Sequence, residues 1–125
     1  MLLISEYEYN ECKIFLDKYY LGNINKKKDI ILIAEEENEK IGYIILEVKC
    51  QLAEIKELFV LEKFRNMKLG EGLLRSSLNL LRLRNINKVV YKYDCNYLIN
   101  KGFIVKKNFL ECNIEDFFLK NNCKR

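Results

Sequence analysis

The chain has 125 residues, half of them hydrophobic and 32% charged, with a formal net charge of +4 at pH 7, which predicts one soluble globular domain spanning residues 1–125. No apolar run approaches the ~18 residues that cross a bilayer, and the start turns acidic too soon for a signal peptide, so we expect a cytoplasmic protein without membrane contact. The sequence has no histidine, which excludes Ser-His and Cys-His nucleophile pairs and leaves carboxylates, Tyr, Lys, Cys and backbone groups for any chemistry.

The first half of the chain predicts a strand, a helix and an antiparallel meander. The expected elements are a strand at 2–4, a helix at 9–20 and strands at 30–34, 41–48 and 52–60. The helix follows from apolar residues at helical spacing, with Asn10 as its cap. The strand at 30–34 is a continuous apolar run rich in β-branched residues, which is typical of a buried strand.

The second half predicts a long helix followed by shorter elements. The expected elements are a helix at 70–84, a strand at 88–94, a short helix at 96–101, strands at 103–106 and 108–112, and a final helix or strand-like tail around 114–118. Leu74, Leu78 and Leu81 form one apolar face of the long helix. Because this helix connects the strands on either side of it, those two strands should run parallel. The whole is a mixed α/β (α+β) domain on one sheet.

The cysteines and the lysine run have ordinary interpretations. The five Cys are widely spaced, without a Cys-x-x-Cys pair, so we expect reduced thiols and no metal site, with Cys123 as an exposed thiol near the end of the chain. Three consecutive lysines, Lys26 to Lys28, are offset by the acidic run at 35–37. We therefore expect a solvated loop there, and nucleic acid as a partner is not predicted.

The most informative stretch is a strand that runs into a glycine-bearing helix start. The apolar strand ends at Val60, a charged turn holds Arg65, and Gly70 and Gly72 open a Leu-rich helix. Such a turn presents free backbone N–H groups at the positive end of a helix dipole, which suits a phosphate group. Two plainer explanations stay open: the glycines could serve helix–sheet packing, and Arg65 could be a solvated turn residue.

These residues resemble the GNAT superfamily of acyl-CoA-dependent N-acetyltransferases. The family motif is a Leu-x-Val strand end, then Arg/Gln-x-x-Gly-x-Gly/Ala, and it matches Leu58-x-Val60 and the segment 65–70 here. An altered form of a second family mark, an aromatic pair before Gly-Phe, occurs at 97–103. The resemblance covers nearly the whole chain and implies the family fold: a mixed central sheet flanked by helices, with splayed parallel strands around Val60 and Lys88.

The resemblance implies a site for acetyl-CoA as cosubstrate. The N–H groups of residues 66–72 would cradle the pyrophosphate, and the Val60 N–H would point at the thioester oxygen. Asn96 would bond the pantetheine arm or cap its own helix. The residues implied for this site are Phe59, Val60, Leu61, Arg65, Asn66, Met67, Lys68, Leu69, Gly70, Glu71, Gly72 and Asn96.

The family reaction is direct attack of a primary amine on acetyl-CoA, which a carboxylate assists by removing a proton. Glu54 is the first candidate for this base and Glu57 the second, because Glu57 faces the opposite side of the strand unless a bulge re-aims it. Tyr97 leads Tyr91 and Tyr93 as the acid that protonates the departing thiolate. The plainer alternative is a solvent-facing pair of glutamates and ordinary core or surface aromatics.

The chain departs from the family pattern in three places. Lys68 stands where the family usually has its first glycine, Leu98 stands where it usually has its acid tyrosine, and the region between the first two strands is short. These departures motivate an alternative function, a weakly active or inactive acetyl-CoA-binding module that acts through a protein partner. The acceptor is not specified. Phe117 and Phe118 would cover the chain's own core or form a homodimer face.

Overall fold

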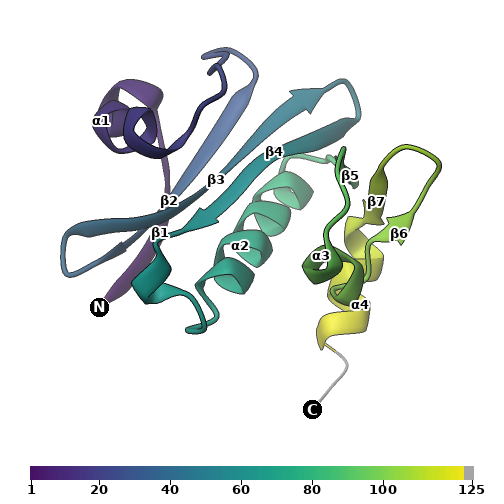
Figure 1. Cartoon of the computed structure of the whole chain (residues 1–125). Helices are drawn as coiled ribbons and strands as arrows, with labels where there is room; N and C mark the ends of the chain where they lie inside the picture. The colour runs from purple at the N-terminus through teal and green to yellow at the C-terminus, as the bar shows by residue number, and fades with distance from the viewer. Residues whose placement is uncertain (123–125) are drawn as a thin grey trace.

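The computed structural model describes residues 1–122, which form a seven-stranded mixed sheet with helices on both faces (Figure 1). The strand order is β1-β2-β3-β4-β5-β7-β6, and β4 and β5 run parallel, as the helix that connects them predicts. The elements are β1 Leu2–Tyr7, α1 Tyr9–Tyr19, β2 Asp29–Glu36, β3 Glu39–Lys49, β4 Leu52–Val60, η1 Glu62–Phe64, α2 Leu69–Leu83, β5 Lys88–Tyr91, α3 Asn96–Asn100, β6 Ile104–Val105, β7 Leu110–Asn113 and α4 Ile114–Asn122. The expectation for Cys123 lies outside the described residues.

The strands β2 and β3 at the centre of the α1 side are buried on both faces. On one face α1 packs over Ile31, Ile33 and Tyr43, and on the other α2 packs over the alternate residues of the same strands. Figure 1 shows α1 on the opposite side of the sheet from α2. This two-sided burial is why β2 reads as a continuous apolar run instead of an alternating one.

Two sequence predictions need correction, and one open alternative is decided. The cap of α1 is Glu8, not Asn10, because Glu8 forms a capping box in which its N–H donates to the Glu11 carboxylate at 2.9 Å. The strand predicted at 88–94 ends at Tyr91. The tail, for which a helix and a strand-like form were both open, is the helix α4, and Phe117 and Phe118 are 2% and 7% exposed and cover the chain's own core.

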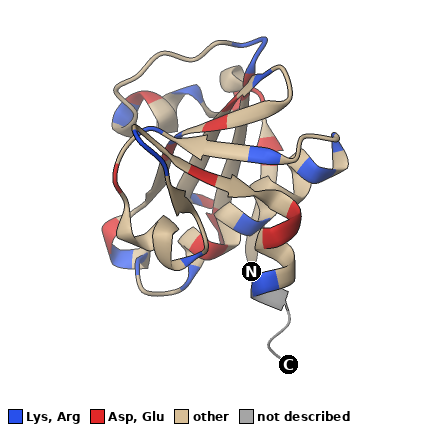
Figure 2. Ribbon diagram, turned by 90° about the vertical axis from the view of Figure 1, so that its right-hand side faces the viewer, with Lys and Arg blue, Asp and Glu red and all other residues tan. Residues whose placement is uncertain are grey.

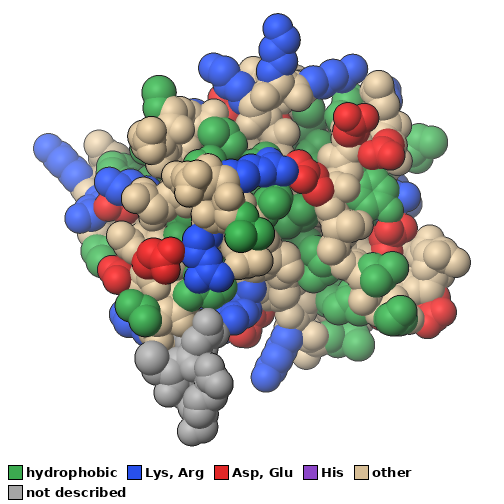
Figure 3. Space-filling model, turned by 180° about the vertical axis from the view of Figure 1, so that it is seen from behind, with side chains coloured by type: hydrophobic (Ala, Val, Ile, Leu, Met, Phe, Trp, Pro, Cys, Tyr) green, Lys and Arg blue, Asp and Glu red, His purple; other side chains and the backbone are tan. Residues whose placement is uncertain are grey.

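The surface carries both signs of charge. Lys and Arg alternate with Asp and Glu across the view in Figure 2. On the face seen from behind, hydrophobic side chains lie in small groups separated by charged and polar ones (Figure 3). No helix in the described part of the chain is long and apolar enough to span a membrane.

Two features of β4 shape the centre of the sheet. Its parallel pairing with β5 stops at Glu54, opposite Val90, so the two strands diverge over the rest of β4. Its pairing with β3 is interrupted by a bulge at Lys56, since Ile45 pairs with Glu57 while Leu46 pairs with Ile55. The bulge turns Glu57 to the same face as Ile45, which is the α1 face.

A buried ion pair holds the bulge. The Lys56 ammonium donates to the Asp29 carboxylate at 2.8 Å and to the Asn23 carbonyl at 2.9 Å. The Asp29 side chain is 0% exposed and that of Lys56 20%. The second carboxylate oxygen of Asp29 has no hydrogen-bond partner among the described residues. The strand bulge and the loop before β2 therefore depend on one pair of charges.

We predict that Asp29→Ala lowers the free energy of unfolding by about 3 kcal/mol, because it strands the Lys56 charge in a mostly buried position. Urea unfolding measures the change. Asp29→Ala combined with Lys56→Met should recover part of the loss, and Asp17→Ala, which breaks an exposed pair with Lys13, should cost less than about 1 kcal/mol. Equal losses in the Asp29 and Asp17 variants would contradict the prediction.

Candidate functional site

A hollow of about 440 Å³ lies between the end of β4 and the start of α2. The residues that line it come from the strand, the turn, the first turn of α2 and the short helix α3. They are Leu58, Val60, Arg65, Asn66, Lys68, Leu69, Gly70, Glu71 and Tyr97. The single continuous stretch that the sequence indicated therefore forms most of one concave surface.

The backbone of the turn is arranged to expose N–H groups. Asn66 and Lys68 both adopt left-handed conformations, with φ of 72° and 62°. Lys68 is the N-cap residue of α2, and no side chain caps the helix there. The first N–H groups of a helix have no acceptor within it, so those of Leu69 and Gly70 are available to an anion. An added Cβ at Gly70 would meet no atom closer than 4.0 Å, the Tyr97 hydroxyl, so this position borders open space.

The left-handed conformation of Lys68 explains the glycine that the family usually has there. We predict that Lys68→Gly raises the free energy of unfolding by about 0.5–1 kcal/mol. Glycine removes the strain of the left-handed conformation from the folded state, and this gain exceeds the stability lost because glycine makes the unfolded chain more flexible. Thermal and urea unfolding measure it. Lys63→Gly, in the short helix η1 just before the turn and without a positive φ, is the control and should lose stability. A loss in both variants would contradict the interpretation.

Two of the charged side chains of the hollow, those of Arg65 and Glu71, are held by other groups of the protein. The Arg65 Nε donates to the Val60 carbonyl at 2.8 Å and ties the turn to the strand end, while its guanidinium lies 5.8 Å from the centre of the Phe59 ring. Glu71 pairs with Lys101 at 2.9 Å, and this bond lowers the pKa of Glu71. Lys101 therefore offsets the one carboxylate that borders the hollow.

Five residues implied for the cofactor site do not line this hollow. They are Phe59, Leu61, Met67, Gly72 and Asn96. Phe59 points to the α1 face, where its ring stacks on that of Tyr19 at 4.9 Å between centroids. A Cβ on Gly72 would lie 3.2 Å from Ile4 Cδ1, so this glycine serves the packing of α2 on the sheet. Asn96 is the first residue of α3.

The sequence interpretation missed Leu58 as a lining residue and Gly42 as the residue opposite Val60. Gly42 pairs with Val60, and an added Cβ there would lie 2.8 Å from the Phe59 carbonyl oxygen. The available signal was a glycine inside an otherwise apolar strand, which indicates close approach of another group.

Tyr97 and Leu98 are consecutive residues of α3 that lie on different sides of this helix. Leu98 is 3% exposed and packs in the core, whereas Tyr97 lines the hollow. Burial, and then the nearby Glu71 and Cys95, raise the pKa of Tyr97 to about 12. The Tyr97 hydroxyl therefore stays protonated at neutral pH, and the raised pKa makes it a weaker acid than an ordinary tyrosine.

Both candidate bases lie on the α1 face of β4. Glu54 is in the last pair with β5, and Glu57 lies beyond the point where β5 separates. Glu57 accepts a hydrogen bond from the Tyr43 hydroxyl, and Tyr43 is fully buried. Burial and the Glu57 carboxylate raise the pKa of Tyr43, which therefore remains a donor. Glu54 differs, because one oxygen lies 2.5 Å from the Lys49 ammonium and the other 3.5 Å from that of Lys92. Glu57 thus has the freer carboxylate.

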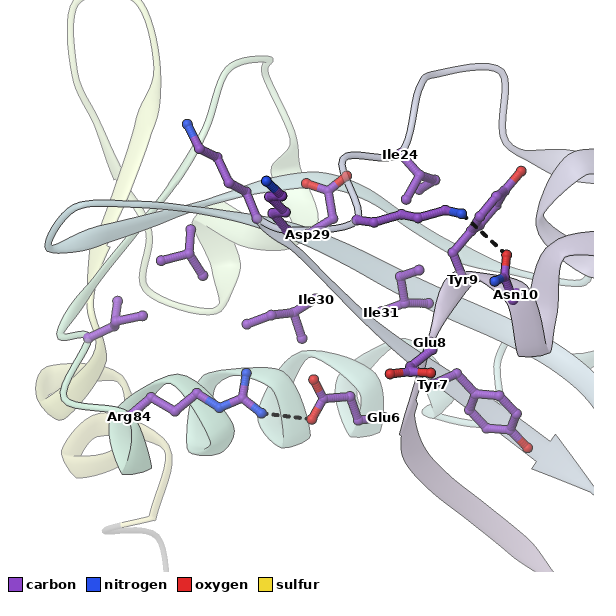
Figure 4. Close-up of a pocket in the computed structure, with 15 residues that line it drawn as sticks. Glu6, Tyr7, Glu8, Tyr9, Asn10, Ile24, Asp29, Ile30, Ile31 and Arg84 are labelled. Carbon is purple, nitrogen blue, oxygen red and sulfur yellow. Dashed lines mark hydrogen bonds and ion pairs between the residues drawn. The ribbon is translucent and has the colours of Figure 1, made fainter.

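A separate hollow of about 670 Å³ lies between the start of α1, the lysine loop and the C-terminal end of α2 (Figure 4). Several of its polar and charged side chains have partners within the protein. Arg84 pairs with Glu6 at 2.8 Å, and the Lys26 ammonium lies 3.5 Å from the Asn10 side chain and 5.8 Å from the centre of the Tyr9 ring. This hollow is at the opposite end of α2 from the phosphate-type turn.

Over residues 1–122, no three His, Cys, Asp or Glu side chains are grouped so that they could hold a metal ion. Cys12, Cys50, Cys95 and Cys112 are free thiols.

A splayed parallel strand pair with an exposed helix N-terminus behind it defines the acyl-CoA N-acyltransferase fold. The family model for the acetyltransferase (GNAT) domain matches residues 27–111, and the chain belongs to this family. A comparison with curated proteins gave no match.

Solved structures agree on the fold. A PaiA N-acetyltransferase from Thermoplasma acidophilum in complex with coenzyme A has a TM-score of 0.75 at 13% identity, over 90% of this chain and 99% of that one. The ribosomal-protein-S18-alanine N-acetyltransferase from Escherichia coli has a TM-score of 0.74 at 13% identity, over 91% and 94%. A GNAT family N-acetyltransferase (YhbS) from Escherichia coli in complex with CoA has a TM-score of 0.72 at 18% identity, over 92% and 82%.

Proposed function

We propose that the protein is an N-acetyltransferase that moves an acetyl group from acetyl-CoA to a primary amine by direct attack. The observation that carries this proposal is the hollow at the start of α2, where an uncapped helix N-terminus meets the end of a strand that has separated from its parallel neighbour. Family membership and CoA-bound structural neighbours support acetyl-CoA as the cosubstrate.

In this proposal the two ends of the cosubstrate use different parts of the site. The pyrophosphate accepts hydrogen bonds from the N–H groups of the turn at 66–72, with Arg65 and Lys68 adding positive charge. The pantetheine arm lies against the strand end, where β4 has no partner on its β5 side. The Val60 N–H donates to the thioester oxygen and stabilises the charge that develops there.

The chemistry crosses the sheet through the gap between β4 and β5. The acceptor approaches from the α1 face, and Glu57 takes the proton of its ammonium, directly or through one water, so that the neutral amine can attack. The new C–N bond forms as the C–S bond breaks, the attacking nitrogen gives up its second proton to water, and the thiolate of CoA leaves. Tyr97, which keeps its proton, is our candidate to protonate that thiolate.

Amine-dependent release of CoA tests the proposal. Acetyl-CoA is offered with a panel of primary amines, and the free thiol of CoA is quantified by chromatography, because Cys50 is exposed and would react with a thiol dye. We expect saturable acetyl-CoA binding and CoA release that rises with one class of amine over a no-amine control. Binding without transfer to any amine would contradict the enzymatic proposal.

That negative result would favour the second candidate, an acetyl-CoA-binding module with weak or no turnover. The observation behind this candidate is Leu98, which is buried in the core at the position of the family's acid tyrosine. Transfer that disappears in a variant of the base would exclude it.

A further inference from the structure

We propose that the acceptor is a small primary amine that also carries a carboxylate and an apolar side chain, with Lys92 as the residue that binds the carboxylate. The inference rests on the proposed acetyl transfer, because it names the substrate class of the same site. It is carried by a second hollow, of about 600 Å³, which opens beside the last parallel pair of β4 and β5. This volume is ordinary for a site that takes a small molecule.

The walls of this hollow are apolar and lie on the α1 face of the sheet. Leu52 from β4 and Val90 from β5 form its floor, and Phe109 and Tyr93 stand at its side. Val90 pairs with Glu54, whose neighbours Ala53 and Ile55 point to the α2 core, so the floor faces the side from which an acceptor would approach. Apolar atoms of an acceptor would be removed from water here.

The charges of the hollow are two ammonium groups and one carboxylate. Lys49 and Lys92 both contact Glu54, which is 8% exposed, and the three side chains leave a net charge of one positive unit. The Lys92 ammonium lies 3.5 Å from a Glu54 carboxylate oxygen, farther than the 2.5 Å between Lys49 and Glu54. The Lys92 side chain is also 59% exposed. Lys92 therefore has donors left for a ligand anion, and a polycationic acceptor would be repelled.

The charges on the two sides of the gap then orient the acceptor. Glu57, on the β4 side, attracts the ammonium that is to be deprotonated, while Lys92, which follows the last paired residues of β5, attracts a negative group on the other side. The apolar floor lies next to this lysine. An α-amino acid with an apolar side chain is the simplest molecule that has all three groups.

The experiment compares leucine with leucinamide in the CoA-release assay. The amide has the same side chain but no negative charge, and its amine loses its proton more readily, so a preference for leucine has to come from binding of the carboxylate. We expect kcat/KM to be at least about tenfold higher for leucine, the value of one hydrogen bond between charged groups. Lys92→Gln should lower kcat/KM for leucine by about tenfold or more, through KM, and leave leucinamide unchanged.

Lys88→Gln is the matched control, since Lys88 is on the same strand, pairs with Glu111 and does not line the hollow. This variant should leave kcat/KM unchanged for both leucine and leucinamide. Equal rates for leucine and leucinamide, or equal losses in the Lys92 and Lys88 variants, would overturn the inference.

If no amine is acetylated, the proposed function fails, and ligand-observed NMR with CoA-saturated protein decides the inference separately. Binding of N-acetylleucine that is stronger than that of N-acetylleucinamide, and that is lost in Lys92→Gln, would support the carboxylate site. Equal binding of the two would overturn it.

Discussion

The double variant Arg65→Glu, Gly70→Asp is expected to lose acetyl-CoA binding, with affinity reduced at least about a hundredfold. The variant puts two carboxylates where the proposed site binds a pyrophosphate, and it also removes the bond from Arg65 that ties the turn to the Val60 carbonyl. Each lost or opposed charge-assisted contact is worth about 1.5–3 kcal/mol, so two of them exceed two factors of ten. Isothermal titration calorimetry with acetyl-CoA measures the change.

Two controls separate charge from size and from general loss of positive charge. Gly70→Asn puts a side chain of nearly the same size as that of Asp into the hollow without its charge, and should lose less affinity for acetyl-CoA than Gly70→Asp. Lys107→Glu makes the same charge change as Arg65→Glu on an exposed residue outside the hollow. Unchanged affinity in the double variant would exclude this turn as the cofactor site.

The second large effect is expected at the base. Glu57→Gln should lower kcat/KM by about 10²–10⁴, the usual contribution of a general base, with the affinity for acetyl-CoA unchanged. Glu54→Gln should lower kcat/KM by less than about tenfold through proton removal, because two ammonium groups already bind the Glu54 carboxylate. Initial rates with the best amine of the panel measure both.

The pH dependence distinguishes a base from a merely structural carboxylate. As the pH rises above the pKa of the acceptor amine, that amine is already neutral, so the deficit of Glu57→Gln should shrink. A deficit that stays constant with pH would indicate that Glu57 only holds Tyr43 in place. A larger loss in Glu54→Gln than in Glu57→Gln would move the role of base to Glu54.

The choice between the two glutamates shows where sequence reasoning stops. Spacing along β4 favoured Glu54, and simple alternation would have turned Glu57 away. The bulge at Lys56 reverses that order, because it brings Glu57 to the α1 face. A bulge depends on how β3 and β4 pair and on a partner for Lys56 at Asp29, and neither is visible in the local pattern of β4.

The elements were predictable where their signal is local or periodic. The bounds of β4 agree with the structure, and those of α2 agree within one residue at each end, because a strand with turns on both sides and a Leu face at helical spacing are determined by nearby residues. The cap of α1 was misplaced, because Glu8 can cap only through its reciprocal bond with Glu11.

By itself the sequence determined the family and the phosphate-type turn, since the strand end, the turn and the helix start are one uninterrupted segment whose conformation is set by its own residues. Only the tertiary structure decided what lies on the other side of the sheet. Glu54, Lys92 and Phe109 belong to three separate segments, and they meet because β5 pairs with β4 and β7 pairs with β5. Pairing of distant strands sets such contacts, and no residue in any one segment encodes them.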